Sequence, residues 1–263
     1  MLFLTTHSIW YAALLLLVPT TIIAMAGPVL IRRMVTLDHL RTNNEVAGFK
    51  FATVGVIYAV LLAFAVIVVW EKFNQAESTV ATEATAASTV IHLSYGVDAQ
   101  HGAVIREATI NYLKTAIARD WPAMAQGRVS TGGTDALGHI YDAVLKFHAI
   151  GNGQESLVIA EMLRQVDRIS ETRRQRLVSA DGTVPGIIWL VLFIGAFLTV
   201  GFTFFFGTAN VRAQAFMTGA LSFLIFAGLV TIVAIDHPFA GTFKVGPEAL
   251  AGVVADFSGA APH

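Results

Sequence analysis

The chain has 263 residues, of which 55% are hydrophobic and only 13% charged, so it is too apolar for a protein that meets water on every side. Its net charge of −1 argues against a nucleic-acid partner, because counterion release from phosphates requires a clustered surplus of Lys and Arg. The absence of cysteine excludes disulfides, thiolate metal sites and a cysteine nucleophile.

Four stretches reach the roughly 20 apolar residues that a membrane-spanning helix needs, namely 8–31, 48–70, 184–206 and 211–235. The first contains Pro19 and Pro28, which are expected to kink or end a helix. Only residues 207–210 separate the last two stretches, so these should form an antiparallel hairpin. Four spans place both termini on one side, and the sequence predicts an integral, multi-pass protein of the inner or plasma membrane.

The charged residues gather between the second and third spans. Of the 35 charged side chains (17 Lys and Arg plus 18 Asp and Glu), 24 lie between positions 71 and 181. This distribution divides the chain into spans 1 and 2 (1–70), a helical aqueous domain (71–182), the span hairpin (183–236) and a C-terminal tail (237–263). We therefore predict an all-α membrane protein with four transmembrane helices and a helical aqueous domain between spans 2 and 3.

The aqueous domain shows helical patterns and no strand signals. Because no Pro or Gly occurs between 71 and 94, the second span is expected to continue into water as one helix. An apolar stripe at three- and four-residue spacing runs along this extension and comprises Phe73, Ala76, Val80, Ala84, Ala87 and Ile91. Further helices are predicted over 98–119, 135–150, 154–180 and, in the tail, 247–257. The first of these should end at Trp121-Pro122, because the residue before a proline avoids helical geometry.

Catalytic motifs are missing from the sequence. It contains no His-Glu-x-x-His, no Gly-x-Ser-x-Gly and no phosphate-binding glycine loop with lysine, and its eight histidines lack a metal-ligand spacing. The cores of the four spans carry no Asp, Glu, Lys or Arg, whereas proton-coupled transporters usually need an ionisable relay there. We predict neither an enzyme nor a metal or cofactor site, which leaves a passive pathway or a structural role.

The second span has two contrasting faces. Small residues at four-residue spacing, Gly55, Ala59 and Ala63, form a ridge on which another helix can pack closely. At about 100° per residue the opposite face carries Ile57, Leu61, Phe64 and Val68, with Lys50 at one end and Glu71 at the other. Several copies around an axis would turn this apolar face into a hydrophobic constriction. The alternative is that the face contacts lipid while Lys50 and Glu71 reach the two interfaces.

Segments spread over the chain resemble a known family. Four parts of the sequence are similar to motifs of the bestrophin-like membrane-protein family. They are the segment 48–64 with Trp70-Glu71, the tripeptide Asp120-Trp121-Pro122, the run 173–177 leading to Pro185 and Trp189, and the pattern Asp236-x-Pro238-Phe239-x-Gly241. The resemblance covers roughly residues 43–247. Each motif alone is weak, but together they are specific.

The chain more distantly resembles the bestrophins themselves, ion channels in which four spans per subunit and a large cytoplasmic helical portion build a pentamer. This resemblance implies that the second span lines the pore, with its neck at Ile57, Leu61, Phe64 and Val68 and its mouths at Lys50 and Glu71. It also implies that residues 71–181 and both termini are cytoplasmic, a point that the Lys and Arg counts on the two sides leave open. The turn at 238–241 lacks the acidic cluster that binds calcium in bestrophins, so calcium gating is not expected.

The leading hypothesis is a homo-oligomeric channel, a pentamer by resemblance, through which small inorganic ions move down their gradient. Its partners would be copies of itself, membrane lipids and the ions, and selectivity stays open because Lys50 and Glu71 favour opposite charges. Two alternatives are a non-conducting membrane scaffold and a membrane protein that binds a lipid or small molecule. Asp236 could cap the turn that follows it or pair with one of three arginines, Arg173, Arg174 and Arg176.

Overall fold

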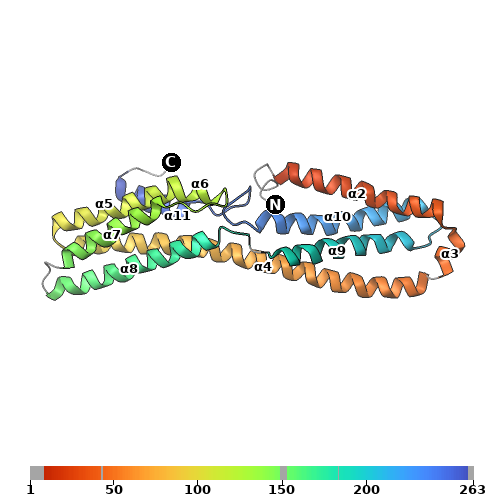
Figure 1. Cartoon of the computed structure of the whole chain (residues 1–263), viewed down its shortest axis with the longest axis horizontal. Coiled ribbons are helices and arrows are strands. Elements are labelled where there is room, and N and C mark those ends of the chain that lie inside the picture. The colour runs from red at the N-terminus through yellow and green to blue at the C-terminus, as the bar shows by residue number, and fades with distance from the viewer. Residues whose placement is uncertain (1–8, 43, 149–152, 183, 260–263) are drawn as a thin grey trace. The chain divides into compact units, whose positions relative to one another are not determined.

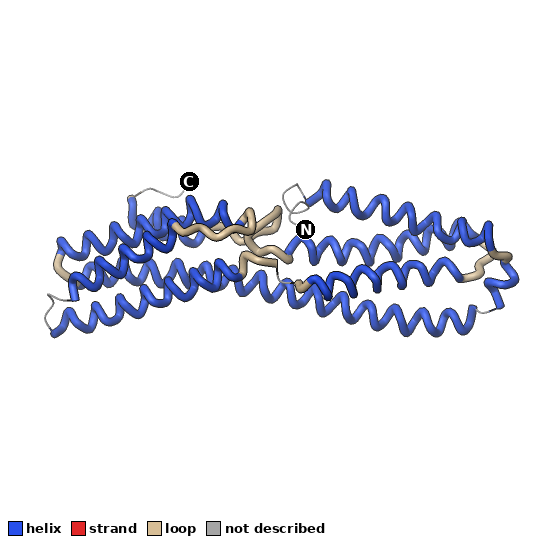
Figure 2. Tube along the Cα trace, viewed as in Figure 1, coloured by secondary structure: helices blue, strands red, loops and turns tan. Residues whose placement is uncertain are grey.

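The structure, a computed structural model, describes residues 9–42, 44–148, 153–182 and 184–259. Every regular element in these ranges is helical (Figures 1 and 2). The chain divides into two compact units: a membrane unit of Met1–Glu71 with Gly182–Asp236, and a second unit of Lys72–Asp181 with His237–His263. Four helical segments are long and apolar enough to cross a membrane: Ala13–Met34, Asn44–Gly96, Gly186–Phe205 and Val211–Ile235. The predicted all-α fold with four spans is therefore confirmed.

The membrane unit contains α2 (Ile9–Met34), a short α3 (Leu37–Thr42), the first part of α4 (Asn44–Leu93), α9 (Gly186–Phe202) with the 3-10 turn η3 (Thr203–Phe205), and α10 (Val211–Ile235). The expectation that the prolines kink or end the first span is corrected in one respect. Pro19 and Pro28 do not end α2, and Thr20 Oγ1 donates to the Leu16 carbonyl at 2.7 Å beside the first of them. The predicted start at residue 8 lies outside the described residues.

Small residues allow these helices to pack closely. A Cβ on Gly219 of α10 would lie 2.6 Å from Met25 of α2, and Gly195 of α9 faces the Tyr58 ring of α4 so tightly that a Cβ would overlap it. The loop before α10 is tied to the start of α4, because Asn44 Nδ2 donates to the Gly207 carbonyl at 2.8 Å and Asn44 Oδ1 accepts from Gly207 N at 2.9 Å. This pair of hydrogen bonds fixes the ends of α4 and α9 at that side of the membrane unit.

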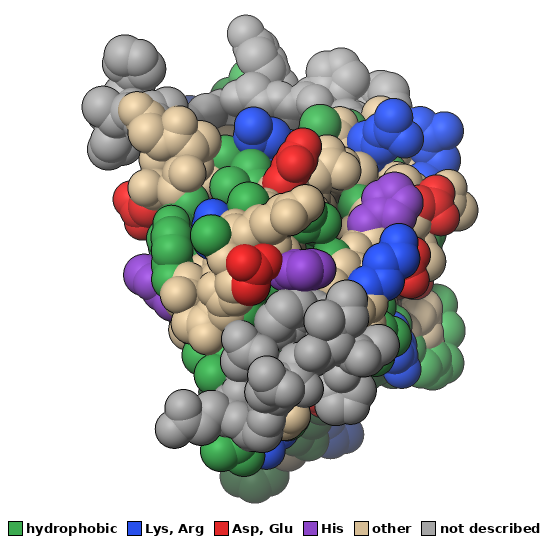
Figure 3. Space-filling view, turned by 90° about the vertical axis from the view of Figure 1, so that its left-hand side faces the viewer, with side chains coloured by type: hydrophobic (Ala, Val, Ile, Leu, Met, Phe, Trp, Pro, Cys, Tyr) green, Lys and Arg blue, Asp and Glu red, His purple; other side chains and the backbone are tan. Residues whose placement is uncertain are grey.

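The second unit is a helical bundle built from the rest of α4, η1 (Ser94–Gly96), α5 (Ala99–Thr115), η2 (Ala116–Asp120), α6 (Trp121–Met124), α7 (Gly132–His148), α8 (Gly153–Val178) and α11 (Glu248–Ser258). The predicted apolar stripe is confirmed: Ala76, Val80, Ala84, Ala87 and Ile91 are all at most 5% exposed. Helix α11 packs on α5, so the tail belongs to this unit. Figure 3 shows one face on which Lys, Arg, Asp, Glu and His side chains are interspersed, as expected for a surface in water.

Helix α4 is unbroken over 50 residues, as the absence of Pro and Gly between 71 and 94 predicted (Figure 1). The helix predicted over 98–119 differs, because Pro122 does not end it. One π-helical turn, η2, follows α5, and the Trp121 N–H bonds back to the Ala116 carbonyl, five residues earlier. The chain then continues as α6 with Pro122 in its first turn, where a missing N–H costs little. The predicted end of the next helix, at 150, lies outside the described residues.

Candidate pore helix and a buried ionic network

The membrane part of α4 buries only one of its faces within the chain. Tyr58, Ala65 and Val69 are at most 8% exposed and belong to the apolar core of the membrane unit. Counting about 100° per residue places this buried face roughly midway between the predicted ridge and the predicted neck. The predicted ridge and the predicted neck therefore both lie outside the face of α4 that is buried within the chain.

The predicted neck residues form a continuous exposed row on α4. Ile57, Leu61, Phe64 and Val68 are 58%, 42%, 62% and 45% exposed, although all four are large and apolar. Lys50 and Glu71, one near each end of the span, are also exposed. In a membrane protein such a row must be covered by lipid or by another subunit, and its role in a pore remains a prediction.

The predicted ridge is likewise uncovered. Ala59 and Ala63 are exposed, and a Cβ on Gly55 would meet no atom within 4 Å. The described residues therefore leave the ridge without the close helix contact that small residues permit. If the ridge serves packing, its partner is a second copy, and this too remains a prediction.

A network of buried charges occupies the second unit. Arg176 holds Glu83 with two hydrogen bonds, Nε to Oε2 at 2.7 Å and Nη2 to Oε1 at 3.0 Å. Asp120 Oδ2 accepts from Arg173 Nε at 3.1 Å and from Arg176 Nη2 at 3.3 Å. Tyr112 donates its hydroxyl to Glu83 Oε1 at 2.6 Å. Two carboxylates and two guanidinium groups therefore balance one another at sites that are at most 6% exposed.

The motif residues that carried the family resemblance converge on this network. Arg176 lies over the Trp121 ring, 4.4 Å from its centroid, and Trp121 Nε1 donates to the Val245 carbonyl at 3.2 Å. The buried Phe239 ring meets the same indole edge-on, with the two centroids 6.1 Å apart. Gly241 has a φ of 86°, a left-handed conformation that favours glycine in the turn after Phe239. These motifs, distant in sequence, together hold the second unit in shape.

Asp236 has one partner that the sequence did not predict. It stands at the C-terminal end of α10, and its Oδ1 accepts from the backbone N–H of Val184 at 2.8 Å, before α9 begins. It thereby links the two helices of the span hairpin. Of the arginines predicted as its partners, Arg173 binds Asp120, and Arg176 binds both Glu83 and Asp120. The nearby Pro238 carbonyl accepts a hydrogen bond from Val245 N at 2.7 Å. This bond closes the turn at 238–241, which we call the family turn.

Burial and charge shift the titration of this network. Burial raises the pKa of Tyr112 well above its usual value, and the negative charge of Glu83 raises it further. For Arg176 burial acts to lower the pKa, but Glu83 and its hydrogen bonds outweigh this, so the pKa lies above the ordinary value. Tyr112 is therefore neutral and Arg176 charged throughout the physiological range.

Sequence reasoning missed Glu83 and Tyr112. Glu83 lies between Val80 and Ala84 on the buried side of α4, in the midst of the predicted apolar stripe. That position was itself a signal, because a carboxylate on a buried face needs a charged or hydrogen-bonding partner. Arg173 and Arg176, spaced three residues apart on one helix, were the available cations.

No metal site accompanies these charges in the described part of the chain, where no group of three or more His, Cys, Asp or Glu side chains is placed to bind an ion. In the family turn, Phe239 and Ala240 are buried and apolar. The turn is thus a packing element of the second unit.

Comparisons with known proteins agree with this architecture. A family model for the bestrophin-like domain matches residues 18–250. No curated protein matches the chain. Among solved structures, a bacterial bestrophin homologue from Klebsiella pneumoniae is similar, with a TM-score of 0.67, 17% identity and coverage of 95% of this chain and 98% of that chain. A point variant of that homologue has a TM-score of 0.68 at 16% identity, covering 94% and 98%. A further structure, described as that of a membrane protein with a single substitution, has a TM-score of 0.69 at 16% identity, covering 95% and 98%.

The chain belongs to the bestrophin-like family, because the family model spans most of its length. It is an integral, multi-pass membrane protein with the bestrophin-like fold. The resemblance drawn from its motifs is confirmed.

Proposed function

We propose that the protein is a homo-oligomeric channel that passes small inorganic ions passively, with α4 lining the path. The observation that carries this proposal is the exposed apolar row Ile57, Leu61, Phe64 and Val68, which runs along a helix with no charge between Lys50 and Glu71. Copies of α4 around an axis would bring these rows together as a narrow apolar neck, which gates by excluding water when it is closed.

The continuation of α4 supports this assignment. Beyond Glu71 the same side of the helix changes from apolar to hydroxyl-bearing residues. These line a hollow of about 400 Å³ together with two residues of α8, and the lining includes Ser78, Thr82, Thr85, Thr89, Gln165 and Arg168. Thr82 and Thr85 donate to carbonyls four residues earlier, at 2.8 and 2.9 Å, so their oxygen lone pairs remain free for water or ions. An apolar neck followed by a wettable surface is the order expected along an ion pathway.

A neck of this kind requires more than one copy, because one subunit leaves the row open on its surface. The small-residue ridge and the remaining apolar faces of α4 supply surfaces on which neighbouring copies can pack. By resemblance to bestrophins the assembly is a pentamer, and the second unit and both termini face the cytoplasm. The bestrophin-like family is one of channels rather than enzymes. The buried ionic network of the second unit then acts as a structural support.

The experiment is single-channel recording of the purified oligomer in a planar bilayer under asymmetric salt. Phe64→Ala should raise the conductance, because it removes the largest side chain of the neck. Ile67→Ala is the matched control, since Ile67 is 50% exposed on α4 but lies away from the neck row. The reversal potential identifies the permeant ion's charge.

A scaffold would behave differently in the same recordings. Intact oligomers that stay silent with Phe64→Ala and with Leu61→Ala would overturn the channel, because widening the neck should open at least one of them. The non-conducting scaffold or the lipid- or small-molecule-binding protein would then be the better account.

A further inference from the structure

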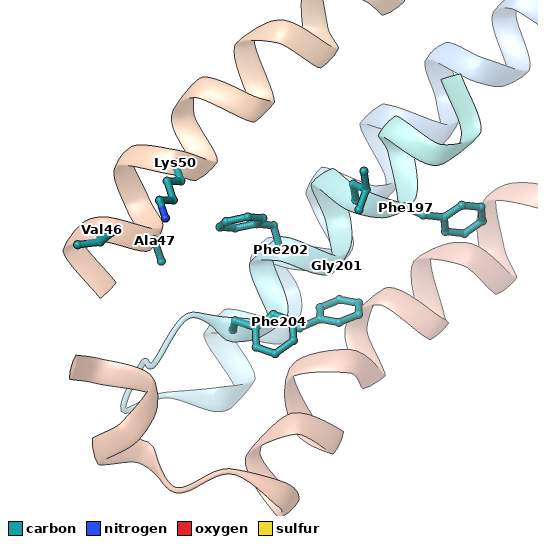
Figure 4. A pocket seen from close by; sticks show the side chains of 9 residues that line it. Val46, Ala47, Lys50, Phe197, Gly201, Phe202 and Phe204 are labelled. Carbon is teal, nitrogen blue, oxygen red and sulfur yellow. The ribbon is translucent and has the colours of Figure 1, made fainter. Parts of the chain in front are cut away.

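A hollow of about 680 Å³ opens in the membrane unit between the beginning of α4 and the end of α9 (Figure 4). Val46 and Lys50 line it from α4, and Phe197, Gly201, Phe202 and Phe205 line it from α9 and η3. In Figure 4 the Lys50 side chain reaches from α4 into the space that faces α9. Its volume falls in the range of about 300–1,000 Å³ that is usual for small-molecule sites.

The chemistry of the hollow is apolar apart from one cation. Lys50 is the only charged side chain that lines it, and none of the described residues forms an ion pair with this lysine. A lysine at the edge of a membrane span extends its ammonium group to the headgroup region. The hollow therefore offers apolar walls for a hydrocarbon chain and a free cation for an anionic group.

The surrounding charge favours the same occupant. At this end of the membrane unit the chain carries five Lys and Arg residues (Arg32, Arg33, Arg41, Lys50 and Arg212) against two acidic ones (Asp38 and Glu45), a surplus of three positive charges. Such a surplus next to the spans attracts anionic headgroups by Coulomb interaction, whichever leaflet they belong to.

Gly201 lines the hollow from α9. A Cβ at this position would meet no atom within 4 Å, so no close helix contact requires glycine there. Glycine within a helix is unfavourable relative to alanine, yet here it opens the wall that faces α4. Because Gly201 lines the hollow, a larger side chain at this position is expected to reduce the space inside it.

We propose that this hollow binds an anionic phospholipid, with an acyl chain between Val46 and the Phe197 and Phe202 rings and the phosphate at Lys50. A soluble anion would leave the apolar walls unused. A zwitterionic phospholipid would bring a second cation to a lysine that needs a negative partner. The site adds a specific lipid ligand to the protein, and it lies beside Lys50, which also marks one mouth of the proposed ion path.

The test measures lipids retained by the purified oligomer. The protein is exchanged into detergent containing equal amounts of phosphatidylglycerol and phosphatidylcholine, and native mass spectrometry counts the lipids bound. The wild type should retain phosphatidylglycerol preferentially. Lys50→Gln should weaken this binding about fivefold and leave phosphatidylcholine unchanged. Gly201→Leu should lower the retention of both lipids by filling the hollow.

Two matched variants control for general effects. Lys72→Gln removes an exposed lysine of α4 near Glu71, and Gly186→Leu makes the same change at the other end of α9, where a Cβ also meets nothing within 4 Å. Both should retain the wild-type preference. Equal retention of the two lipids by the wild type, undiminished phosphatidylglycerol binding in Lys50→Gln, or displacement of the lipid by millimolar inorganic phosphate would each overturn the proposal. Because no current is measured, these results do not depend on the channel proposal.

Discussion

Replacing Arg176 by leucine should unfold the second unit at a markedly lower temperature. The buried network holds two negative and two positive groups, and Arg176 contacts both carboxylates. Arg176→Leu leaves Arg173 as the only cation of the network, and Arg173 bonds to Asp120 alone, so Glu83 keeps only the Tyr112 hydroxyl. An unpaired charge in a site that is 0% exposed costs about 3–5 kcal/mol.

The corresponding assay is a thermal melt of the oligomer in detergent, followed by tryptophan fluorescence, which includes Trp121 beneath Arg176. For a chain of this size 1 kcal/mol shifts the melting temperature by about 2–4 °C, so the single variant should melt about 6–20 °C lower. The double variant Glu83→Leu, Arg176→Leu removes one charge of each sign and leaves the Asp120–Arg173 pair. It should be more stable than the single variant and remain about 1–3 kcal/mol below the wild type, because Tyr112 loses its acceptor.

Two outcomes would refute this reasoning. A single variant that melts within about 2 °C of the wild type would show that the site is wet or that the charges are not held as pairs. A double variant as unstable as the single would show that packing of the long side chains, and not charge balance, controls stability.

Two further predictions concern the same unit. Gly133→Ala should lower the melting temperature, because the added Cβ would lie 2.7 Å from Asp120 Oδ2, whereas Gly138→Ala on the same helix meets nothing within 4 Å and should be neutral or stabilising by about 0.5–1 kcal/mol. The melting temperature should also fall as the pH rises above about 10, because the unfolded state ionises its tyrosines there while burial keeps the pKa of Tyr112 higher in the fold. The contribution of Tyr112 is thus complete below about pH 10 and lost above it, so Tyr112→Phe should reduce the slope; an unchanged slope would contradict the assignment.

Long periodic features of the sequence predicted the fold well. Helix α4 was foreseen as one unbroken element because nothing between 71 and 94 interrupts a helix, and its buried stripe from Ala76 to Ile91 follows from three- and four-residue spacing. These are local properties of a helix, so the sequence alone is enough to predict them.

Features that depend on tertiary contact were not predicted. Pro122 was expected to end a helix, but a π turn shifts the hydrogen bonding and lets the chain continue into α6. Asp236 was assigned a choice of partners, and the structure pairs it with the backbone of Val184, which no spacing rule could indicate. The convergence of Trp121, Arg176 and Phe239 likewise requires knowledge of how the helices are arranged.

The central claim, a pore along α4, can be tested directly because the chain contains no cysteine. Single cysteines at Leu61 and Val68 would be exposed to a charged thiol reagent during planar-bilayer recording, with Ile67→Cys as the control on the same helix. We expect the reagent to change the current through the two neck variants and leave the control unaffected, since only thiols that meet water react as thiolates. Currents that are unchanged at 61 and 68, or modified equally at 67, would contradict a path lined by this face of α4.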